Sequence, residues 1–129
     1  MKKWSGSAAV CINKNNEVLM VRGKDSNAWA VPSGGIETGE TPESCCVREV
    51  KEETGYDVLI KNKIHIKETL IDEIEVITYY FNVEIIGGEI EINDPDQTII
   101  EAGWKSISEL HNLEHMYPED IAVIKKSGD

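Results

Sequence analysis

One segment, residues 34–56 (GGIETGETPESCCVREVKEETGY), constrains the fold most, because it carries the signals for both ends of a helix. Thr41 fits the N-cap position, and Pro42 follows at the first helical position, where its missing N–H costs no hydrogen bond. Gly55 is a natural stop, because glycine readily adopts the left-handed conformation that ends many helices. The segment therefore predicts a helix that begins at Thr41-Pro42 and runs to Thr54.

Strands are predicted on both sides of this helix. Apolar residues alternate with polar ones through residues 75–85, which predicts a strand with one buried face. Shorter apolar runs bounded by turn-forming residues predict further strands at 7–12, 17–22, 29–31, 57–68, 89–92 and 99–105. The polar cluster 13–16 and the pair Gly87-Gly88 predict hairpin turns, and residues 33–35 (SGG) predict a flexible turn.

Two shorter helices are predicted near the C-terminus. Ser106 and Glu109 have the spacing of a capping box, and residues 118–126 favour a terminal helix. Strands around a central and a late helix are typical of an α+β or mixed α/β fold. At 129 residues the chain is about one domain long, so we expect a single domain over residues 1–129.

The formal net charge of −11 argues against partners that are themselves polyanions. Binding to DNA or to an anionic membrane rests on lysine and arginine, so we expect neither. The N-terminus lacks an apolar run of signal-peptide length, and the three cysteines do not form a disulfide framework. These features favour a cytoplasmic protein. The sequence leaves the oligomeric state open, and a homodimer is among the forms it allows.

Three carboxylates share one side of the predicted helix. Glu49, Glu52 and Glu53 are spaced i, i+3 and i+4, so they lie close together and repel one another. Mg²⁺ and Mn²⁺ prefer oxygen ligands, and a carboxylate cluster is what proteins usually supply. Arg48 can pair with Glu52 one turn later. The alternative interpretation is an acidic helix face exposed to solvent.

The wider pattern resembles the box of the Nudix hydrolase family, also known from MutT-like enzymes. The matching positions in this sequence are Gly34, Glu40, Arg48, Glu49, Val50, Glu52, Glu53 and Gly55. Two positions depart from the family: Tyr56 replaces an aliphatic residue, and Ser33 stands where many members have glycine. The family's metal contact at Ser33 comes from a backbone carbonyl, so serine is compatible with it.

The resemblance implies an α/β fold, a Nudix-type α/β/α sandwich around a mixed β-sheet. It implies hydrolysis of a nucleoside diphosphate linked to another moiety, with Mg²⁺ or Mn²⁺ as cofactor. Glu49, Glu52, Glu53 and the Ser33 carbonyl would bind the metal, and Arg48 would orient the carboxylates. Glu40 and Gly34 would hold the metal-binding residues in place without contacting the metal themselves. Glu52 or Glu49 would be the general base.

Candidates outside the box come from position and residue type. Glu101 is the best outside candidate for the general base, ahead of Glu73 and Glu75. Arg22, or Lys24 after it, could bind a substrate phosphate. The aromatic residues Trp29, Tyr80 and Trp104 are candidates for stacking on a base, although packing in the core is the more frequent role of a single aromatic residue.

The expected partner is a small nucleotide-like diphosphate, and its identity stays open. Residues 71–74 (IDEI) carry neither a proline nor a tyrosine, the residues associated with the ADP-ribose and dinucleoside-polyphosphate subfamilies. A MutT-like nucleoside triphosphate pyrophosphohydrolase is therefore the default expectation. The alternatives are an ADP-ribose or nucleotide-sugar pyrophosphatase, an RNA cap-trimming enzyme, which the net charge disfavours, and a non-catalytic nucleotide-binding module.

Overall fold

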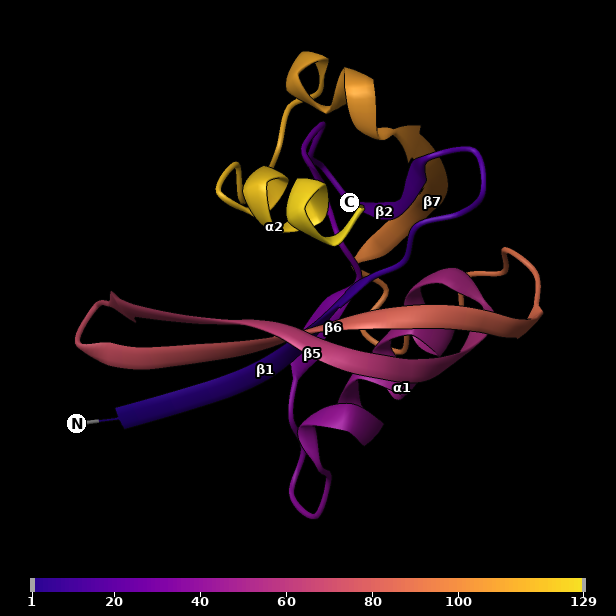
Figure 1. Ribbon diagram of the computed structural model, residues 1–129. Coiled ribbons are helices and arrows are strands. Elements are labelled where there is room, and N and C mark those ends of the chain that lie inside the picture. The colour runs from indigo at the N-terminus through magenta and orange to yellow at the C-terminus, as the bar shows by residue number, and fades with distance from the viewer. Residues whose placement is uncertain (1, 129) are drawn as a thin grey trace.

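The structure is a computed structural model that describes residues 2–128 (Figure 1). A four-stranded mixed sheet has the order β4-β1-β6-β5, and a three-stranded antiparallel sheet has the order β3-β2-β7. β1 pairs parallel with β6 and antiparallel with β4, and β5 pairs antiparallel with β6. The strands are β1 (Lys2–Val10), β2 (Glu17–Gly23), β3 (Trp29–Ala30), β4 (Ser33–Gly35), β5 (Tyr56–Ile71), β6 (Ile74–Gly88) and β7 (Ile99–Ser106).

Helix α1 (Pro42–Thr54) has the ends that the sequence predicts. The Thr41 hydroxyl accepts a hydrogen bond from the Ser44 N–H, and the Ser44 hydroxyl accepts one from the Thr41 N–H, both at 3.0 Å. This reciprocal capping box satisfies two amide groups that the first turn leaves unpaired. At the other end Gly55 adopts φ 91°, in the left-handed region, and donates its N–H to Lys51. The helix prediction is confirmed at both ends.

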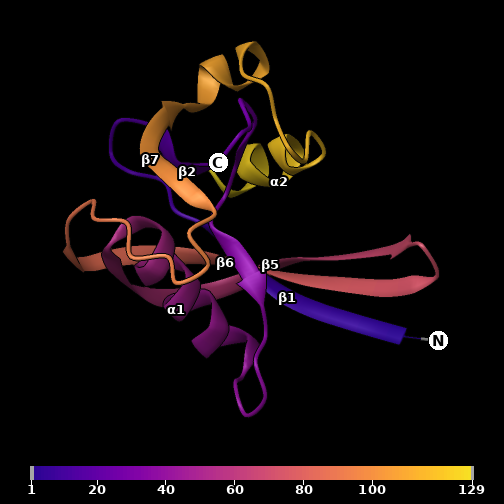
Figure 2. The same cartoon turned by 180° about the vertical axis from the view of Figure 1, so that it is seen from behind.

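The mixed sheet separates two apolar cores, and helices lie on both of its sides, as expected for an α/β/α sandwich. α1 covers one face, where Val50 and the two sheet residues Phe81 and Val83 are buried. α2 (Asp120–Ser127) and the 3-10 helix η1 (Ile107–Asn112) lie on the other side, together with the smaller sheet. Figures 1 and 2 show α1 and α2 on opposite sides of the β1-β6-β5 layer. The α/β fold predicted from the sequence is confirmed.

Four local predictions are wrong, and tertiary pairing explains most of the differences. Residues 33–35 form strand β4, because they pair with β1. Gly87 and Gly88 do not form a hairpin turn, because both pair with the start of β5 as the last residues of β6. Residues 89–92 are not a strand, because their backbone follows the end of α1, where Glu91 donates its N–H to Thr54. Ser106 makes no capping hydrogen bond to η1.

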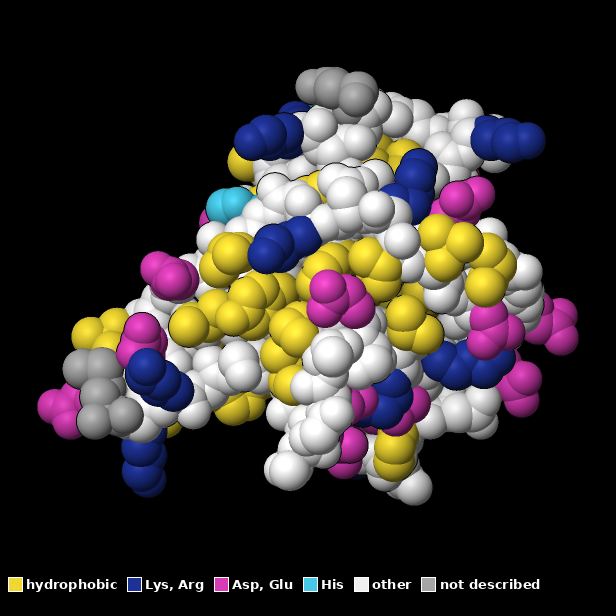
Figure 3. Space-filling model, turned by 60° about the horizontal axis from the view of Figure 1, so that its bottom comes forward, with side chains coloured by type: hydrophobic (Ala, Val, Ile, Leu, Met, Phe, Trp, Pro, Cys, Tyr) yellow, Lys and Arg dark blue, Asp and Glu magenta, His cyan; other side chains and the backbone are white. Residues whose placement is uncertain are grey.

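The β5–β6 hairpin, with β1 beside it, extends from the body of the molecule as an arm (Figures 1 and 2). Its tip turns at Asp72 and Glu73, both with positive φ. Several large apolar side chains along the arm are exposed, among them Trp4, Leu70 and Ile71. Figure 3 shows apolar side chains spread over the face seen there, between scattered charged ones. Among residues 2–128, no helix is long and apolar enough to cross a membrane.

Candidate functional site

The candidate site forms where β4 meets the inner side of α1. The backbone of Gly34 lies directly against the Glu49 carboxylate, so close that a Cβ on residue 34 would overlap that side chain. Gly34 in turn pairs with Ser7 of β1, which fixes its position in the sheet. The Ser7 hydroxyl donates to the carbonyl of Pro42 at 2.7 Å and ties β1 to the first turn of α1. The sheet edge and the helix are therefore held in close contact at this point.

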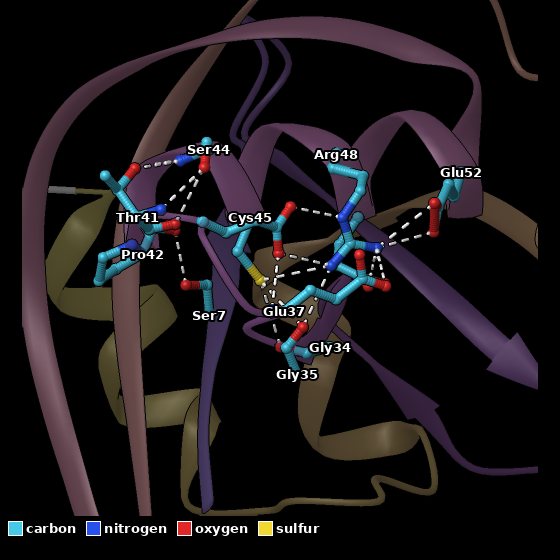
Figure 4. A network of polar contacts seen from close by, with 12 residues as sticks. Ser7, Gly34, Gly35, Glu37, Thr41, Pro42, Ser44, Cys45, Arg48 and Glu52 are labelled. Carbon is cyan, nitrogen blue, oxygen red and sulfur yellow. Dashed lines mark hydrogen bonds and ion pairs between the residues drawn. The ribbon is translucent and has the colours of Figure 1, made fainter.

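Arg48 connects the acidic residues of the site in a single network (Figure 4). Its guanidinium donates to Glu40 at 2.6 and 2.9 Å, to Glu49 at 2.7 Å and to Glu52 at 3.1 Å. It also donates to the carbonyl of Gly35 at 3.1 Å, which anchors it to β4. The hydrogen bond from Arg48, helped by the backbone N–H of Glu37, lowers the pKa of Glu40 to about 2. The predicted pair between Arg48 and Glu52 is confirmed.

Glu53 differs from the other glutamates of the site, because no basic residue pairs with it in the described part of the chain. Its side chain is buried, with 6% of the residue exposed, and it accepts a hydrogen bond from the Ser33 N–H at 3.3 Å. Burial, followed by the hydrogen bond and charge of Glu49, raises the pKa of Glu53 well above its usual range. Burial and the charge of Glu49 also raise the pKa of Glu52. Buried carboxylates of this kind need a cation or a proton.

The three carboxylates of α1 are close together but do not form a ready-made metal-binding geometry. Within residues 2–128, no three Asp, Glu, His or Cys side chains converge on one point. The carboxylates of Glu49 and Glu52 turn towards Arg48, whereas that of Glu53 turns towards Ser33. The oxygen donors are of the kind that Mg²⁺ and Mn²⁺ prefer. The residues therefore suit a hard divalent cation, provided that the side chain of Glu52 rotates.

Two cavities meet at Ser33. One, of about 490 Å³, opens towards Glu53 and Lys24, and the other, of about 230 Å³, extends towards β1 and α2. Val31 and Tyr117 also line both. The smaller cavity, which we call the Asp120 pocket, is lined by residues that include Trp4, Ser33, Lys67, Thr78, Tyr80, Tyr117 and Asp120.

The wall of the Asp120 pocket contains a buried polar group, the Asp120 carboxylate with its two hydrogen-bond donors. The Tyr80 hydroxyl donates to the Asp120 carboxylate at 2.7 Å, and the Lys67 ammonium donates to the same carboxylate oxygen at 3.3 Å. Burial raises the pKa of Asp120, more than the contacts with Tyr80 and Lys67 lower it. The Lys67 ammonium also lies 4.7 Å from the centre of the Tyr117 ring. A charged, hydrogen-bonding surface is thus placed beside Ser33.

The other predicted residues lie outside the carboxylate cluster. Glu101 pairs with Arg22 at 2.9 Å, and Arg22 also donates to the Ser26 carbonyl at 2.6 Å, so this pair holds the loop after β2. Trp29 is packed in the core beneath the Lys105 ammonium, which lies 3.9 Å from the ring centre. Tyr80 is buried, and it lines the Asp120 pocket with its hydroxyl directed to Asp120.

The sequence patterns did not identify several residues of the Asp120 pocket. Trp4 lies over Gly6 of its own strand, β1, and Gly35 of the neighbouring β4, and is 45% exposed. Lys67 lies among other lysines of β5, and alternation along the strand could have placed it on this face. Tyr117 and Asp120 come from a distant segment, and no local signal indicates that they meet β5 and β6.

Comparison with known proteins places nearly the whole chain in one family. Residues 2–126 match the model of the NUDIX domain. An ADP-ribose pyrophosphatase of Methanocaldococcus jannaschii is 30% identical over 119 residues, covering 88% of this chain and 67% of that protein. Nudix hydrolase 5 of Arabidopsis thaliana is 34% identical over 126 residues, or 93% of this chain and 42% of that protein, so the chain spans less than half of the plant protein's length.

The architecture agrees with that assignment. The crystal structure of a UDP-X diphosphatase superposes with a TM-score of 0.83 at 19% identity, covering 98% of this chain and 63% of the other. At this level of identity the likeness concerns the fold.

Proposed function

Because this chain belongs to the Nudix family, we propose that it is a hydrolase of phosphoanhydride bonds that depends on Mg²⁺ or Mn²⁺. The observation that carries the proposal is Glu53, a buried carboxylate beside Glu49 with no basic partner among residues 2–128. A divalent cation would offset the cost of burying this charge, and the cavity at Ser33 and Glu53 would admit it. Glu49, Glu52, Glu53 and the Ser33 carbonyl would hold the cation.

The reaction adds a water oxygen to one phosphorus of the diphosphate and breaks that atom's bond to the bridging oxygen. The products are a nucleoside monophosphate and the phosphorylated remainder of the substrate. A bound divalent cation supplies a more acidic water and stabilises charge on the phosphate oxygens. The protein residues hold the reacting groups: Arg48 orients Glu49 and Glu52, and Glu40 and Gly34 keep Arg48 and Glu49 in place.

Glu52 is the general base that the geometry favours. Its side chain is 23% exposed against 14% for Glu49, and Arg48 holds it at a longer distance, 3.1 against 2.7 Å. Glu52 is therefore freer to accept a proton from water. Glu101 remains the candidate outside the box, and its carboxylate would have to leave Arg22 to act. The Glu101→Gln variant separates these two assignments, because Glu52→Gln would lose a metal ligand in either case. A wild-type rate for Glu101→Gln would exclude Glu101 as the base, and a large loss of rate would favour it.

The organic part of the substrate would occupy the Asp120 pocket. Trp4 and Tyr117 are each nearly half exposed and line this pocket, so a flat base could stack on them. Asp120 would accept a hydrogen bond from the edge of the base, and Lys67 would donate one to it. Lys24, which lines the cavity at Glu53, would face the phosphates. This arrangement supports a MutT-like nucleoside triphosphate pyrophosphohydrolase as the first choice.

A second candidate is hydrolysis of ADP-ribose or a nucleotide sugar. The archaeal relative, named an ADP-ribose pyrophosphatase, favours it. The products distinguish the two, because a nucleoside triphosphate gives a nucleoside monophosphate and pyrophosphate, whereas ADP-ribose gives AMP and ribose phosphate. A substrate panel with Mg²⁺ and with Mn²⁺, resolved by chromatography, is the test. Binding of these compounds without turnover of any of them would favour the non-catalytic module instead.

A further inference from the structure

A third cavity, of about 520 Å³, lies between α2 and the middle of the β5–β6 hairpin. We call it the Asn82 cavity. Its lining residues come from β5 (Asn62, Lys63, Ile64 and His65), from β6 (Asn82) and from α2 (Ala122, Val123, Lys126 and Ser127). None of these residues lines either of the cavities that meet at Ser33. The Asn82 cavity is therefore separate from the proposed catalytic site.

The polar groups of the Asn82 cavity have unused hydrogen-bonding capacity. Asn62 and Asn82 are directly opposite one another in the strand register, which places two carboxamides side by side. Among residues 2–128, the Ser127 hydroxyl is the one buried side-chain oxygen or nitrogen without a hydrogen-bond partner. A buried hydroxyl normally has a partner, because leaving it unsatisfied costs free energy. That oxygen is inaccessible to solvent, so a ligand could pair with it only after neighbouring side chains move, and the two carboxamides are the polar groups open to the cavity.

The strand is irregular at this point. β5 shifts register against β6 between Ile60 and Asn62, and again between Lys63 and His65. Each shift adds a residue to one strand and redirects the side chains around it. Ile64, in the second shift, packs against the core that lies under α2, and the His65 ring makes an edge contact with Tyr80 at 5.5 Å. The two bulges thus shape the wall of the Asn82 cavity.

The charge of the Asn82 cavity is opposite to that of the protein. The chain has a net charge of −11, yet no Asp or Glu is among the lining residues. Lys126 and His65 are exposed at its edge. Lys63 also lines the cavity, and its ammonium lies 6.0 Å from the centre of the Tyr79 ring. Ile64 and Val123 provide apolar walls. The cavity is suited to a molecule with a flat polar ring and an anionic group.

We propose that the Asn82 cavity is a second ligand site, which binds a nucleoside monophosphate. The carboxamides of Asn62 and Asn82 can each donate to and accept from the edge of a base, and Ile64 and Val123 can pack on its faces. The Lys126 ammonium would pair with the phosphate. The proposal goes beyond the catalytic function, since it requires neither the carboxylate cluster nor turnover.

Titration of the isotope-labelled full chain by NMR, without divalent metal, tests this proposal. The probes are AMP, GMP, CMP and UMP, with adenosine and inorganic phosphate as partial ligands. We expect at least one monophosphate to shift the side-chain amide signals of Asn62 and Asn82 in a saturable way, and adenosine or phosphate to bind more weakly. Lys126→Ala should raise the Kd about tenfold. The neighbouring Lys125→Ala is the matched control, because Lys125 is exposed and does not line the cavity.

Three outcomes overturn the proposal. One is that no monophosphate shifts the two carboxamide signals. Another is that the shifts are confined to Ser33, Lys67 and Tyr117, which would assign the binding to the Asp120 pocket. The third is that the Lys125 and Lys126 variants weaken binding equally, which would indicate unspecific attraction to a basic helix end. All are read without catalysis, so failure here is distinct from failure of the proposed hydrolase activity.

Discussion

The Arg48 guanidinium holds the Glu40 carboxylate by two hydrogen bonds, of 2.6 and 2.9 Å, and lowers the pKa of Glu40 from 4.5 to about 2. An arginine–carboxylate ion pair with two hydrogen bonds is stronger and more precisely oriented than one with a single hydrogen bond. The consequence is a link between the acidic helix and the loop in front of it. This link fixes the direction of Arg48, which in turn contacts Glu49 and Glu52.

The stability of the protein should therefore depend on Glu40 in a defined pH window. A carboxyl group with a lowered folded-state pKa stabilises the fold above its unfolded pKa, and this contribution is lost as the pH falls through the folded-state value. Glu40→Gln should lower the free energy of unfolding at pH 7, and the difference from the wild type should vanish between pH 4.5 and about 2. Urea unfolding over that range measures it, with the exposed Glu43→Gln as control. A difference that stays constant with pH would contradict the pairing.

Gly34→Ala should impair activity more than stability. A methyl group there would displace the Glu49 carboxylate, the flexible end of a side chain, and leave the backbone in place. We expect kcat/KM to fall by about tenfold or more and Tm to change by only a few degrees. Gly103→Ala is the control, because nothing lies within 4 Å of the added Cβ at that position. Equal activity of the two variants would show that Glu49 does not need its observed position.

Glu53→Gln should make the metal-free protein more stable and remove its response to metal. Because burial raises the pKa of Glu53, the folded state loses stability as the pH rises above 4.5, and glutamine has no charge to bury. At pH 7.5 the metal-free variant should be more stable by roughly 1 kcal/mol. Millimolar Mg²⁺ should raise the wild-type Tm by a few degrees and leave that of the variant unchanged. Thermal unfolding with and without Mg²⁺ measures both, and an equal Mg²⁺ response in the two proteins would count against Glu53 as a ligand.

Trp4→Ala should weaken substrate binding without changing the chemical step. Its indole is 45% exposed and lines the Asp120 pocket, where we place the base. Loss of stacking should raise KM about five- to tenfold and leave kcat within a factor of two. Leu59→Ala is a matched control, because Leu59 is 41% exposed on the same sheet but lines none of the cavities described above. An unchanged KM would place the base elsewhere.

The local features of the sequence predicted α1 and its ends, because Thr41, Pro42 and Gly55 act within one or two helical turns. The i, i+3, i+4 spacing also placed Glu49, Glu52 and Glu53 together, and the Arg48–Glu52 pair followed from the same geometry. Strand β4 was missed because Ser33 and its two glycines have no strand propensity of their own and pair only when β1 is beside them.

The Asp120 pocket could not have been predicted from local patterns. Lys67, Tyr80 and Asp120 are separated by 13 to 53 positions and meet only when α2 packs on the hairpin. Residue type alone made Arg22 and Glu101 candidates for the site. In the structure the two side chains pair with each other across β2 and β7. Their functional roles remain predictions.

The most direct test of the central claim, metal-dependent hydrolysis through the carboxylates of α1, is the turnover of Glu52→Gln. Steady-state hydrolysis would be measured with saturating Mg²⁺ on the best substrate of the panel, after circular dichroism has shown that the variant is folded. We predict that kcat falls at least about a hundredfold, with no more than a small change in KM. A Glu52→Gln variant that turns over at the wild-type rate, or a wild type that is equally active in excess chelator, would contradict the account.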